Sequence, residues 1–366
     1  ISNSELKWER TGQFDIGVDL GFFRDRVQLT VDWYQKITRD LLLLADLPYT
    51  MGFESAYENV GKMRNRGLEI SLKTVNVKTR NFRWESDFNI SFNRNKILSL
   101  TGNQRNLYSF VPLNTNFNNS PLYVAQVGQP TGMFFGYVFD GIYQEEDFDQ
   151  PSPGKYILKD NVPTNGNERS VIQPGDIKYR DLNGDGVVNT YDQTIIGRGQ
   201  PLHTGGFNNT FTYKGFSLGI FLSWSYGNDV YNANRLFLEG NTLVATDINQ
   251  YKSYESRWTP ENRSNKYFRT GGQGPAGYHS SRVLEDGSYL RLQNLTFGYN
   301  FPRKWLKRIY LSSLNLSFTA RNLVTFTGYS GMDPSVSTRS SILTPSFDYS
   351  AYPSAKSFMF SLKTTF

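Results

Sequence analysis

The sequence predicts an all-β protein, a transmembrane antiparallel β-barrel with long extracellular loops. Apolar and polar residues alternate with a period of two along much of the chain, as expected of strands that have one apolar and one polar face. Aromatic residues make up 15% of the 366 residues, yet the mean hydropathy is −0.50. No segment approaches the ~18 consecutive apolar residues that a membrane-spanning helix needs. We therefore expect the chain to cross a membrane with strands.

The first strand shows the alternation clearly, in the apolar series Phe14, Ile16, Val18, Leu20 and Phe22. The pattern recurs along the chain and gives about nine strands, each near the ~9–11 residues that cross a bilayer when tilted. The later strands are expected at 27–34, 68–72, 82–93, 207–213, 216–226, 290–301, 314–318 and 358–366. Within 290–301 the alternation changes phase at Gln293-Asn294, which predicts a β-bulge.

The connections between these strands alternate in length. Short turns are expected near 23–25, 77–81, 214–215 and 302–309, and long polar segments fill approximately 40–62, 97–201, 227–286 and 327–353. Bacterial barrels place short turns in the periplasm and long loops outside, so the long segments are predicted to be extracellular.

The structural alternative is a soluble β-sandwich or solenoid with the same alternation. Two features argue against it. One is a loop of about 105 residues, which compact soluble domains seldom contain. The other is a set of aromatic residues at strand ends, where membrane interfaces place them. These are Trp33, Tyr34, Trp224, Tyr226 and Tyr299.

The chain is expected to be the C-terminal part of a larger barrel. Complete bacterial barrels have an even number of strands, whereas this pattern gives an odd number. An open edge in lipid would leave backbone groups unpaired. No secretory signal precedes the first strand, so we expect that a leader and earlier strands lie upstream of Ile1.

Composition excludes several other classes of function. The net charge of +6 is spread along the chain without a basic block, which argues against nucleic-acid binding. The absence of cysteine excludes disulfides, zinc-thiolate sites and a cysteine nucleophile. His203 and His279 lie in different loops, and the acidic run at 145–147 resembles a glycosidase pair only in composition. The G-x-G-x-x-G match at 272–277 lacks the strand and helix of a dinucleotide site. No enzyme is predicted.

Several segments together resemble one family, the C-terminal barrel of SusC/RagA-type TonB-dependent transporters of Bacteroidetes. They are Leu6–Leu43, Val60–Thr74, Gly175–Gly197, Ser288–Pro302, Thr319–Ser335 and the terminal SAKSFMFSLKTTF. The resemblance implies a barrel of about 22 strands, with an N-terminal plug, a TonB-box and early strands upstream of residue 1. It also implies a place in the bacterial outer membrane, among its lipids, with loops on the cell surface.

The resemblance further implies TonB-dependent import of oligosaccharides or oligopeptides, together with a SusD-like surface lipoprotein. Two other functions remain open from the sequence. One is a passive porin or surface-adhesion barrel, which a plug and a TonB-box upstream would exclude. The other is a secreted carbohydrate-binding β-protein, which would be soluble without detergent.

The segment 181–192 has the ligand spacing of an EF-hand-like calcium loop. Oxygen-bearing residues occupy positions one, three, five, nine and twelve, position seven offers its backbone carbonyl, and glycine stands at position six. The ligands would be Asp181, Asn183, Asp185, Val187, Asn189 and Asp192. The loop ends in aspartate rather than glutamate, as in dockerin-type loops. We expect a structural Ca²⁺ in an extracellular loop, with an Asx-turn cluster without metal as the alternative.

Substrate contacts are expected from aromatic and amide side chains in the long loops, which can stack on a polymer and hydrogen-bond to it. The candidates are Tyr137, Phe139, Tyr143, Tyr231 and Asn234. Packing within the loops is the favoured explanation for each, so the sequence assigns no individual residue to substrate.

Overall fold

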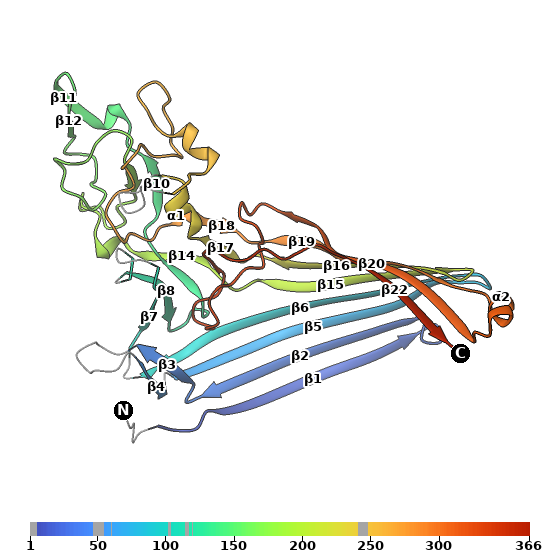
Figure 1. The fold of residues 1–366 in the computed structure, drawn as a ribbon. Coiled ribbons are helices and arrows are strands. Elements are labelled where there is room, and N and C mark those ends of the chain that lie inside the picture. Colours follow the sequence, from blue (N-terminus) through green and yellow to red (C-terminus); the bar gives the residue numbers. More distant parts are fainter. Residues whose placement is uncertain are drawn as a thin grey trace.

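The computed structural model describes residues 6–46, 55–59, 61–101, 104–113, 117–118, 120–240 and 248–366. Its main feature is a sheet of nine antiparallel strands, which run from a lobe of folded connections to a set of short turns (Figure 1). In order along the sheet these are β1 (Arg10–Phe22), β2 (Val27–Arg39), β5 (Gly61–Lys78), β6 (Phe82–Leu100), β15 (His203–Tyr213), β16 (Phe216–Tyr226), β19 (Tyr289–Asn300), β20 (Ser313–Thr327) and β22 (Ser357–Thr365).

The register of the sheet gathers apolar side chains on one face and polar side chains on the other. One apolar row runs across β1 to β20 through Leu20, Leu29, Leu72, Phe88, Phe207, Leu222, Leu292 and Val324. The adjacent row contains Asp19, Thr30, Ser71, Asn89, Gly206, Ser223, Arg291 and Thr325. A slip of one residue in any strand would exchange its two faces. The rows therefore define an apolar outer face and a polar inner face.

All nine predicted strands are confirmed, as is the predicted bulge. β19 pairs with β16 and with β20 both before and after Gln293, and Gln293 itself has no partner in either register. The strands that most exceed the expected length are β5, with 18 residues, and β6, with 19. Their ends nearest the folded connections extend past the apolar rows, and these ends carry charged side chains.

The short turns lie where the sequence places them. Lys214 and Gly215 both have positive φ, of 45° and 95°, as the tight two-residue turns of hairpins require. The last short turn, between β19 and β20, holds α2 (Arg303–Leu306) and a 3₁₀ helix (Lys307–Ile309). The sheet is not closed, because β1 and β22 are its two edges.

One of the aromatic residues predicted at the membrane interface, Tyr34, does not lie on the apolar face of the sheet. Trp33 and Trp224 lie on the apolar face, where Trp224 stacks on Phe88 with ring centroids 5.7 Å apart. Tyr34 lies on the polar face instead, and its hydroxyl donates a hydrogen bond of 3.2 Å to the side chain of Asn93. Because neighbouring residues of a strand point to opposite faces, Trp33 and Tyr34 cannot both face lipid.

The long connections, predicted as polar loops, contain much secondary structure of their own. Their strands are β3 (Leu42–Asp46), β4 (Ser55–Asn59), β7 (Asn106–Phe110), β8 (Pro121–Gln126), β9 (Met133–Gly136), β10 (Phe139–Ile142), β11 (Phe148–Ser152), β12 (Lys155–Leu158), β13 (Ile177–Tyr179), β14 (Thr194–Arg198), β17 (Asp229–Asn232), β18 (Leu284–Asp286) and β21 (Phe347–Asp348). Their helices are α1 (Asn234–Leu238) and 3₁₀ turns at Glu145–Asp147, Thr190–Asp192, Lys252–Ser256 and Ser281–Val283.

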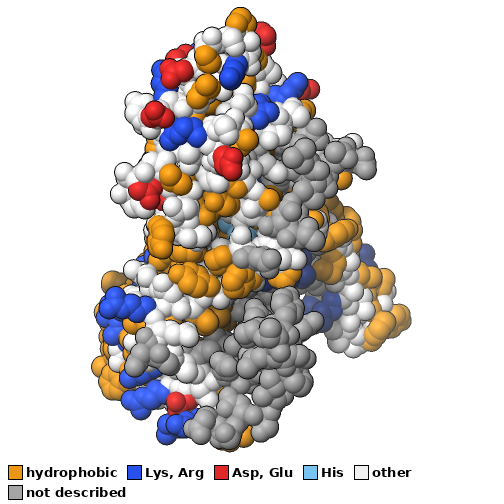
Figure 2. Space-filling model, turned by 90° about the vertical axis from the view of Figure 1, so that its left-hand side faces the viewer, with side chains coloured by type: hydrophobic (Ala, Val, Ile, Leu, Met, Phe, Trp, Pro, Cys, Tyr) orange, Lys and Arg blue, Asp and Glu red, His pale blue; other side chains and the backbone are white. Residues whose placement is uncertain are grey.

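We call the described residues of 104–201, 227–286 and 328–356 the loop layer. It holds the hydrophobic core, in three clusters centred on Phe134, on Trp258 and on Phe148. Of the buried hydrophobic residues that the structure describes, only Ile97 and Ala320 lie on the nine-stranded sheet. Seen from the loop end, charged side chains of both signs cover the upper lobe, and an apolar belt lies beneath it (Figure 2). The loop layer thus folds as a globular unit on the end of the sheet.

Candidate functional site

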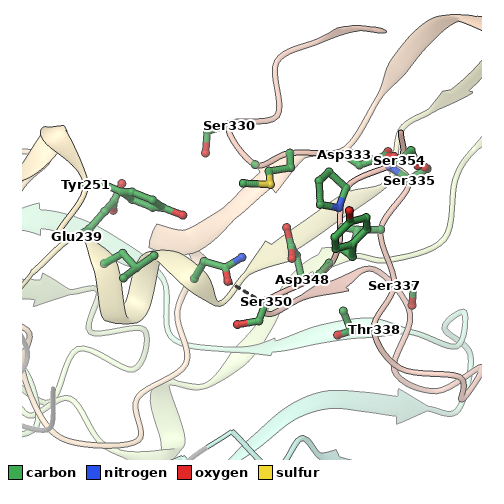
Figure 3. Close-up of a pocket in the computed structure, with 18 of the residues that line it drawn as sticks. Glu239, Tyr251, Ser330, Asp333, Ser335, Ser337, Thr338, Asp348, Ser350 and Ser354 are labelled. Carbon is green, nitrogen blue, oxygen red and sulfur yellow. Dashed lines mark hydrogen bonds between the residues drawn. The ribbon is translucent and has the colours of Figure 1, made fainter. Parts of the chain in front are cut away.

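A cavity of about 930 Å³ opens in the loop layer. Its walls come from α1, from the segment that includes Tyr251 and Tyr267, and from the connection between β20 and β22 (Figure 3). Seven serine and threonine hydroxyl groups lie in the lining, those of Ser253, Ser330, Ser335, Ser337, Thr338, Ser350 and Ser354. Three carboxylates complete the polar part of the wall, those of Glu239, Asp333 and Asp348.

Exposed aromatic and thioether groups stand beside these hydroxyls. Tyr352 is 93% exposed, Met332 is 78% exposed and Tyr251 is 40% exposed. Hydroxyl groups donate and accept hydrogen bonds, and aromatic faces provide flat apolar contacts. The cavity can therefore hold a polar chain molecule by stacking and hydrogen bonding together.

A buried ionic network lies behind the cavity wall, which one of its members, Glu239, lines. Arg282 Nη1 lies 2.9 Å from Glu239 Oε2, and Arg235 contacts Glu239 at 2.9 Å and Glu285 at 3.1 Å. These four side chains are at most 12% exposed. Burial lowers the pKa of Arg282, and Glu239 opposes that change. For Arg235, burial acts to lower the pKa, but Glu239 and Glu285 outweigh it and raise the pKa. Both arginines therefore remain paired cations.

Hydrogen bonds join the connection after β20 to the same network. The backbone N–H of Ser330 donates to Glu285 at 2.7 Å, and the Tyr329 hydroxyl donates to Asp348 at 2.5 Å. The Ser350 N–H donates to the side-chain oxygen of Asn234 at 2.8 Å. Burial, and then the hydrogen bond to Asp348, raise the pKa of Tyr329, so its hydroxyl stays protonated.

Asp333 anchors this connection to the wall of the barrel. Its carboxylate lies 2.6 Å from Arg291 Nη2 of β19, and both side chains are about a tenth exposed. Ser335 donates to the same carboxylate through its hydroxyl and its N–H. Burial acts to raise the pKa of Asp333, but the hydrogen bonds from Ser335 and Ser354 and the nearby Arg291 outweigh it and lower the pKa to about 2. Asp333 is therefore an ionised carboxylate at neutral pH, paired with the Arg291 cation.

The structure separates the five candidate substrate contacts. Tyr137, Tyr143 and Tyr231 are buried to within 2% exposure and pack in the core clusters, in line with the packing explanation that the sequence favours. Phe139 is partly buried against the second cluster. Asn234 lines the cavity. The serine-rich lining between residues 330 and 338 was not predicted, although its high content of hydroxyl groups is visible in the sequence.

The predicted calcium loop adopts a compact turn with an ordered pattern of hydrogen bonds. Asp181 accepts from the N–H groups of Gly184 and Gly186, each at 2.7 Å. Asp185 accepts from Val187 N–H at 2.8 Å. Asp192 is fully buried and accepts from Leu182 N–H and Asn189 N–H, each at 2.8 Å.

These contacts order the loop, and calcium binding stays a prediction. Burial acts to raise the pKa of Asp181, but hydrogen bonds from Gly186 and Gly184 outweigh it and lower the pKa, which keeps a charged oxygen ligand available. Within the described residues no group of three or more His, Cys, Asp or Glu side chains is placed to hold a metal ion. A complete site would need the amide oxygens of Asn183 and Asn189 and the Val187 carbonyl.

The two histidines lie apart and form no catalytic arrangement with each other. His203 accepts a hydrogen bond of 3.1 Å from the indole N–H of Trp224 at the end of β15. His279 is buried in the loop layer, 2.9 Å from the Tyr231 hydroxyl, and burial lowers its pKa to about 3. A neutral histidine in a packed core is a structural element, and so His279 does not supply an acid–base group at neutral pH.

A sheet with one apolar and one polar face, short turns at one end and a folded loop layer at the other is the wall of a transmembrane β-barrel. Residues 1–323 match the family model described as TonB dependent receptor-like, beta-barrel. The chain belongs to this family, whose barrels lie in the outer membrane. No helix within the described residues is long and apolar enough to cross a membrane.

Three relatives illustrate the match. TonB-dependent receptor P3 of Formosa agariphila is 32% identical over 374 residues, covering 100% of this chain and 35% of that protein. TonB-dependent receptor SusC of Bacteroides thetaiotaomicron is 27% identical, covering 100% of this chain and 32% of that protein. The structure of the RagAB peptide transporter matches with a TM-score of 0.78 and 26% identity, covering 100% of this chain and 36% of that chain. These relatives are receptors and transporters rather than enzymes.

This chain spans about a third of the length of these relatives. The match to the family model and to these relatives confirms the resemblance to the barrel of SusC/RagA-type transporters.

Proposed function

We propose that this chain forms part of the wall and the cell-surface vestibule of a TonB-dependent importer of oligosaccharides or oligopeptides. The observation that carries the proposal is the cavity of about 930 Å³ in the loop layer. It combines hydroxyl groups, fixed carboxylates and exposed aromatic faces, which suit a polar polymer better than an apolar ligand. Import through the barrel requires the long connections to face the outside of the cell, where substrate arrives.

Partners and energy coupling follow from the same proposal. A surface lipoprotein of the SusD kind would cover the loop layer and enclose substrate in the vestibule, and TonB would drive import through a plug formed by another part of the protein. The names SusC and RagAB support this assignment, since RagAB is described as a peptide transporter. Both substrate classes stay open, because hydroxyl and aromatic groups contact glycans and peptides alike.

The decisive experiment measures substrate uptake by cells that carry the full-length transporter. Tyr352→Ala removes an aromatic face that is 93% exposed at the cavity, and Tyr310→Ala removes one that is 90% exposed at the short-turn end of the sheet. We expect the first variant to weaken uptake about fivefold to tenfold, as loss of a binding hot spot of about 1 kcal/mol or more does. Tyr310→Ala should leave uptake unchanged.

Glycan and peptide libraries, supplied separately, identify the substrate class. Uptake that persists without TonB or without a proton gradient would support the passive porin instead. Cells that take up neither library but bind to a surface through this protein would support the adhesion barrel.

We also propose a structural Ca²⁺ in the loop 181–192. The support is the spacing of its oxygen ligands and the lowered pKa of Asp181. Removal of calcium should then loosen this loop and leave the sheet intact.

A further inference from the structure

Four cationic side chains stand together on the apolar face of β5 and β6. The register pairs Arg66 directly with Arg94 and Arg64 directly with Lys96. Residues that alternate along a strand share a face, so these four lie on the same side as Leu68 and Phe92, in the next two rows toward the loop layer. We call Arg64, Arg66, Arg94 and Lys96 the basic quartet.

Inner-face contacts confirm that the quartet points outward. Asn93 donates to Asn65 at 3.4 Å and accepts from the Tyr34 hydroxyl, and these residues alternate with the quartet. Ser91 donates to Glu69 at 3.3 Å on the same inner face. The quartet therefore occupies the opposite face, which in a closed barrel faces lipid rather than the lumen.

The quartet lies at the height of a lipid head group. The apolar side chains of β6 begin at Phe82, near the short turn, and Arg94 follows Phe82 by twelve residues. Twelve residues of strand span roughly 40 Å, or about 30 Å across the membrane at a tilt of about 40°. The apolar band of such barrels is about 25 Å tall. The cations therefore begin just beyond the hydrocarbon.

The four cations of the basic quartet lack acidic partners within the described part of the chain. None of the four forms an ion pair there. Arg94 donates instead to two backbone carbonyls, those of Asn93 and Leu202. The Nε of Arg64 is buried and without a hydrogen-bond partner. Like charges directly opposite each other destabilise a sheet, at Cβ separations of about 4.5–5.5 Å. A bound anion would remove that repulsion.

We propose that the basic quartet binds the phosphate groups of a phosphorylated lipid in the outer leaflet. Arginine binds phosphate with two parallel hydrogen bonds, and clustered cations at a membrane surface attract anionic head groups. The apolar rows immediately beside the quartet hold the acyl chains of the same lipid. The inference rests on the proposed function for one point, that the loop layer faces outside.

The test uses the full-length transporter, purified in detergent and mixed with lipid A in mixed micelles. Wild type should bind phosphorylated lipid A. R66Q/R94Q should bind about tenfold more weakly, and the charge-preserving R66K/R94K should lie between them. The matched control is K304Q/R308Q, which removes two exposed cations from the short-turn end of the sheet and should bind as wild type does. Equal binding by wild type and R66Q/R94Q would overturn the proposal.

Two further experiments are needed. The first distinguishes a lipid phosphate from free phosphate, and the second tests whether the loop layer faces the outside of the cell. Dephosphorylated lipid A should bind weakly, and inorganic phosphate at equal concentration should not displace the lipid; displacement would show a site for free phosphate instead. Labelling of a cysteine placed at the exposed Ser152 in intact cells tests the orientation. If that residue is inaccessible from outside, the proposed function fails. If it is accessible but lipid A does not bind, only the lipid proposal fails.

Discussion

The sheet and the loop layer of this chain bury their side chains by different rules. On the sheet, Phe326 and Phe358 are 62% and 61% exposed in the isolated chain, because their outer surroundings in a membrane are lipid. In the loop layer, Phe134 and Tyr231 are fully buried, as in a water-soluble domain. The comparison teaches that one sequence can combine a wall stabilised by backbone pairing and lipid with a lobe stabilised by a conventional core.

A matched pair of phenylalanine substitutions tests this comparison with the largest expected effect. Phe134→Ala should destabilise the loop layer by about 3–5 kcal/mol, because it opens a cavity among Tyr123, Tyr231 and their neighbours. Phe326→Ala should cost far less, because lipid fills the space. Limited proteolysis reports on the loop layer and heat-modifiable gel mobility on the barrel. Equal sensitivity of both variants by both readouts would contradict the comparison.

The buried ionic network should give the next largest effect. Glu239→Gln keeps the shape of the side chain but leaves Arg282 without its partner at 2.9 Å, at a cost of about 3 kcal/mol. We expect faster proteolysis of the loop layer and weaker substrate uptake. Arg263→Gln, which breaks ion pairs of an arginine that is 46% exposed, serves as the control and should change little. A stable Glu239→Gln loop layer would show that the network is not needed for folding.

The Arg291–Asp333 pair joins the two regions, and its effect should depend on pH. The folded pKa of Asp333, about 2, lies below the ordinary value near ~3.9. Its stabilisation is therefore present above about pH 4 and is lost as the pH falls through the folded pKa. Asp333→Asn should weaken docking of the connection after β20 by about 2 kcal/mol at neutral pH. Hydrogen exchange at residues 330–340 measures it, and the difference between variant and wild type should shrink near pH 2.

The smallest and most local effect is expected from the calcium loop. Chelation of calcium should increase proteolysis within 181–192 in the wild type, and the barrel should keep its heat-modifiable mobility. Asp181→Asn should abolish the response to calcium, since it removes a charged ligand. A loop whose proteolysis is the same with calcium, with chelator and in Asp181→Asn would indicate an Asx-turn cluster without metal.

The sequence determined the sheet in detail, because a strand reveals its two faces locally. The series from Phe14 to Phe22 alternates whatever its neighbours are, and the change of phase at Gln293 marks the bulge without knowledge of β20. Such local patterns could not predict the cavity. Its contacts join residues far apart in the chain, such as Arg282 with Glu239 and Arg291 with Asp333, 43 and 42 residues away.

Local pattern also does not distinguish which loop aromatics are free to bind. Tyr231 and Tyr352 both lie in polar loop sequence, yet one is fully buried and the other is 93% exposed. Only packing of separate connections against each other separates them. The sequence by itself thus determined strand positions, faces and family, because backbone pairing and lipid act on each strand in the same way. Tertiary structure decided the core of the loop layer, the cavity and the neighbours of the basic quartet, because long-range contacts have no local periodicity.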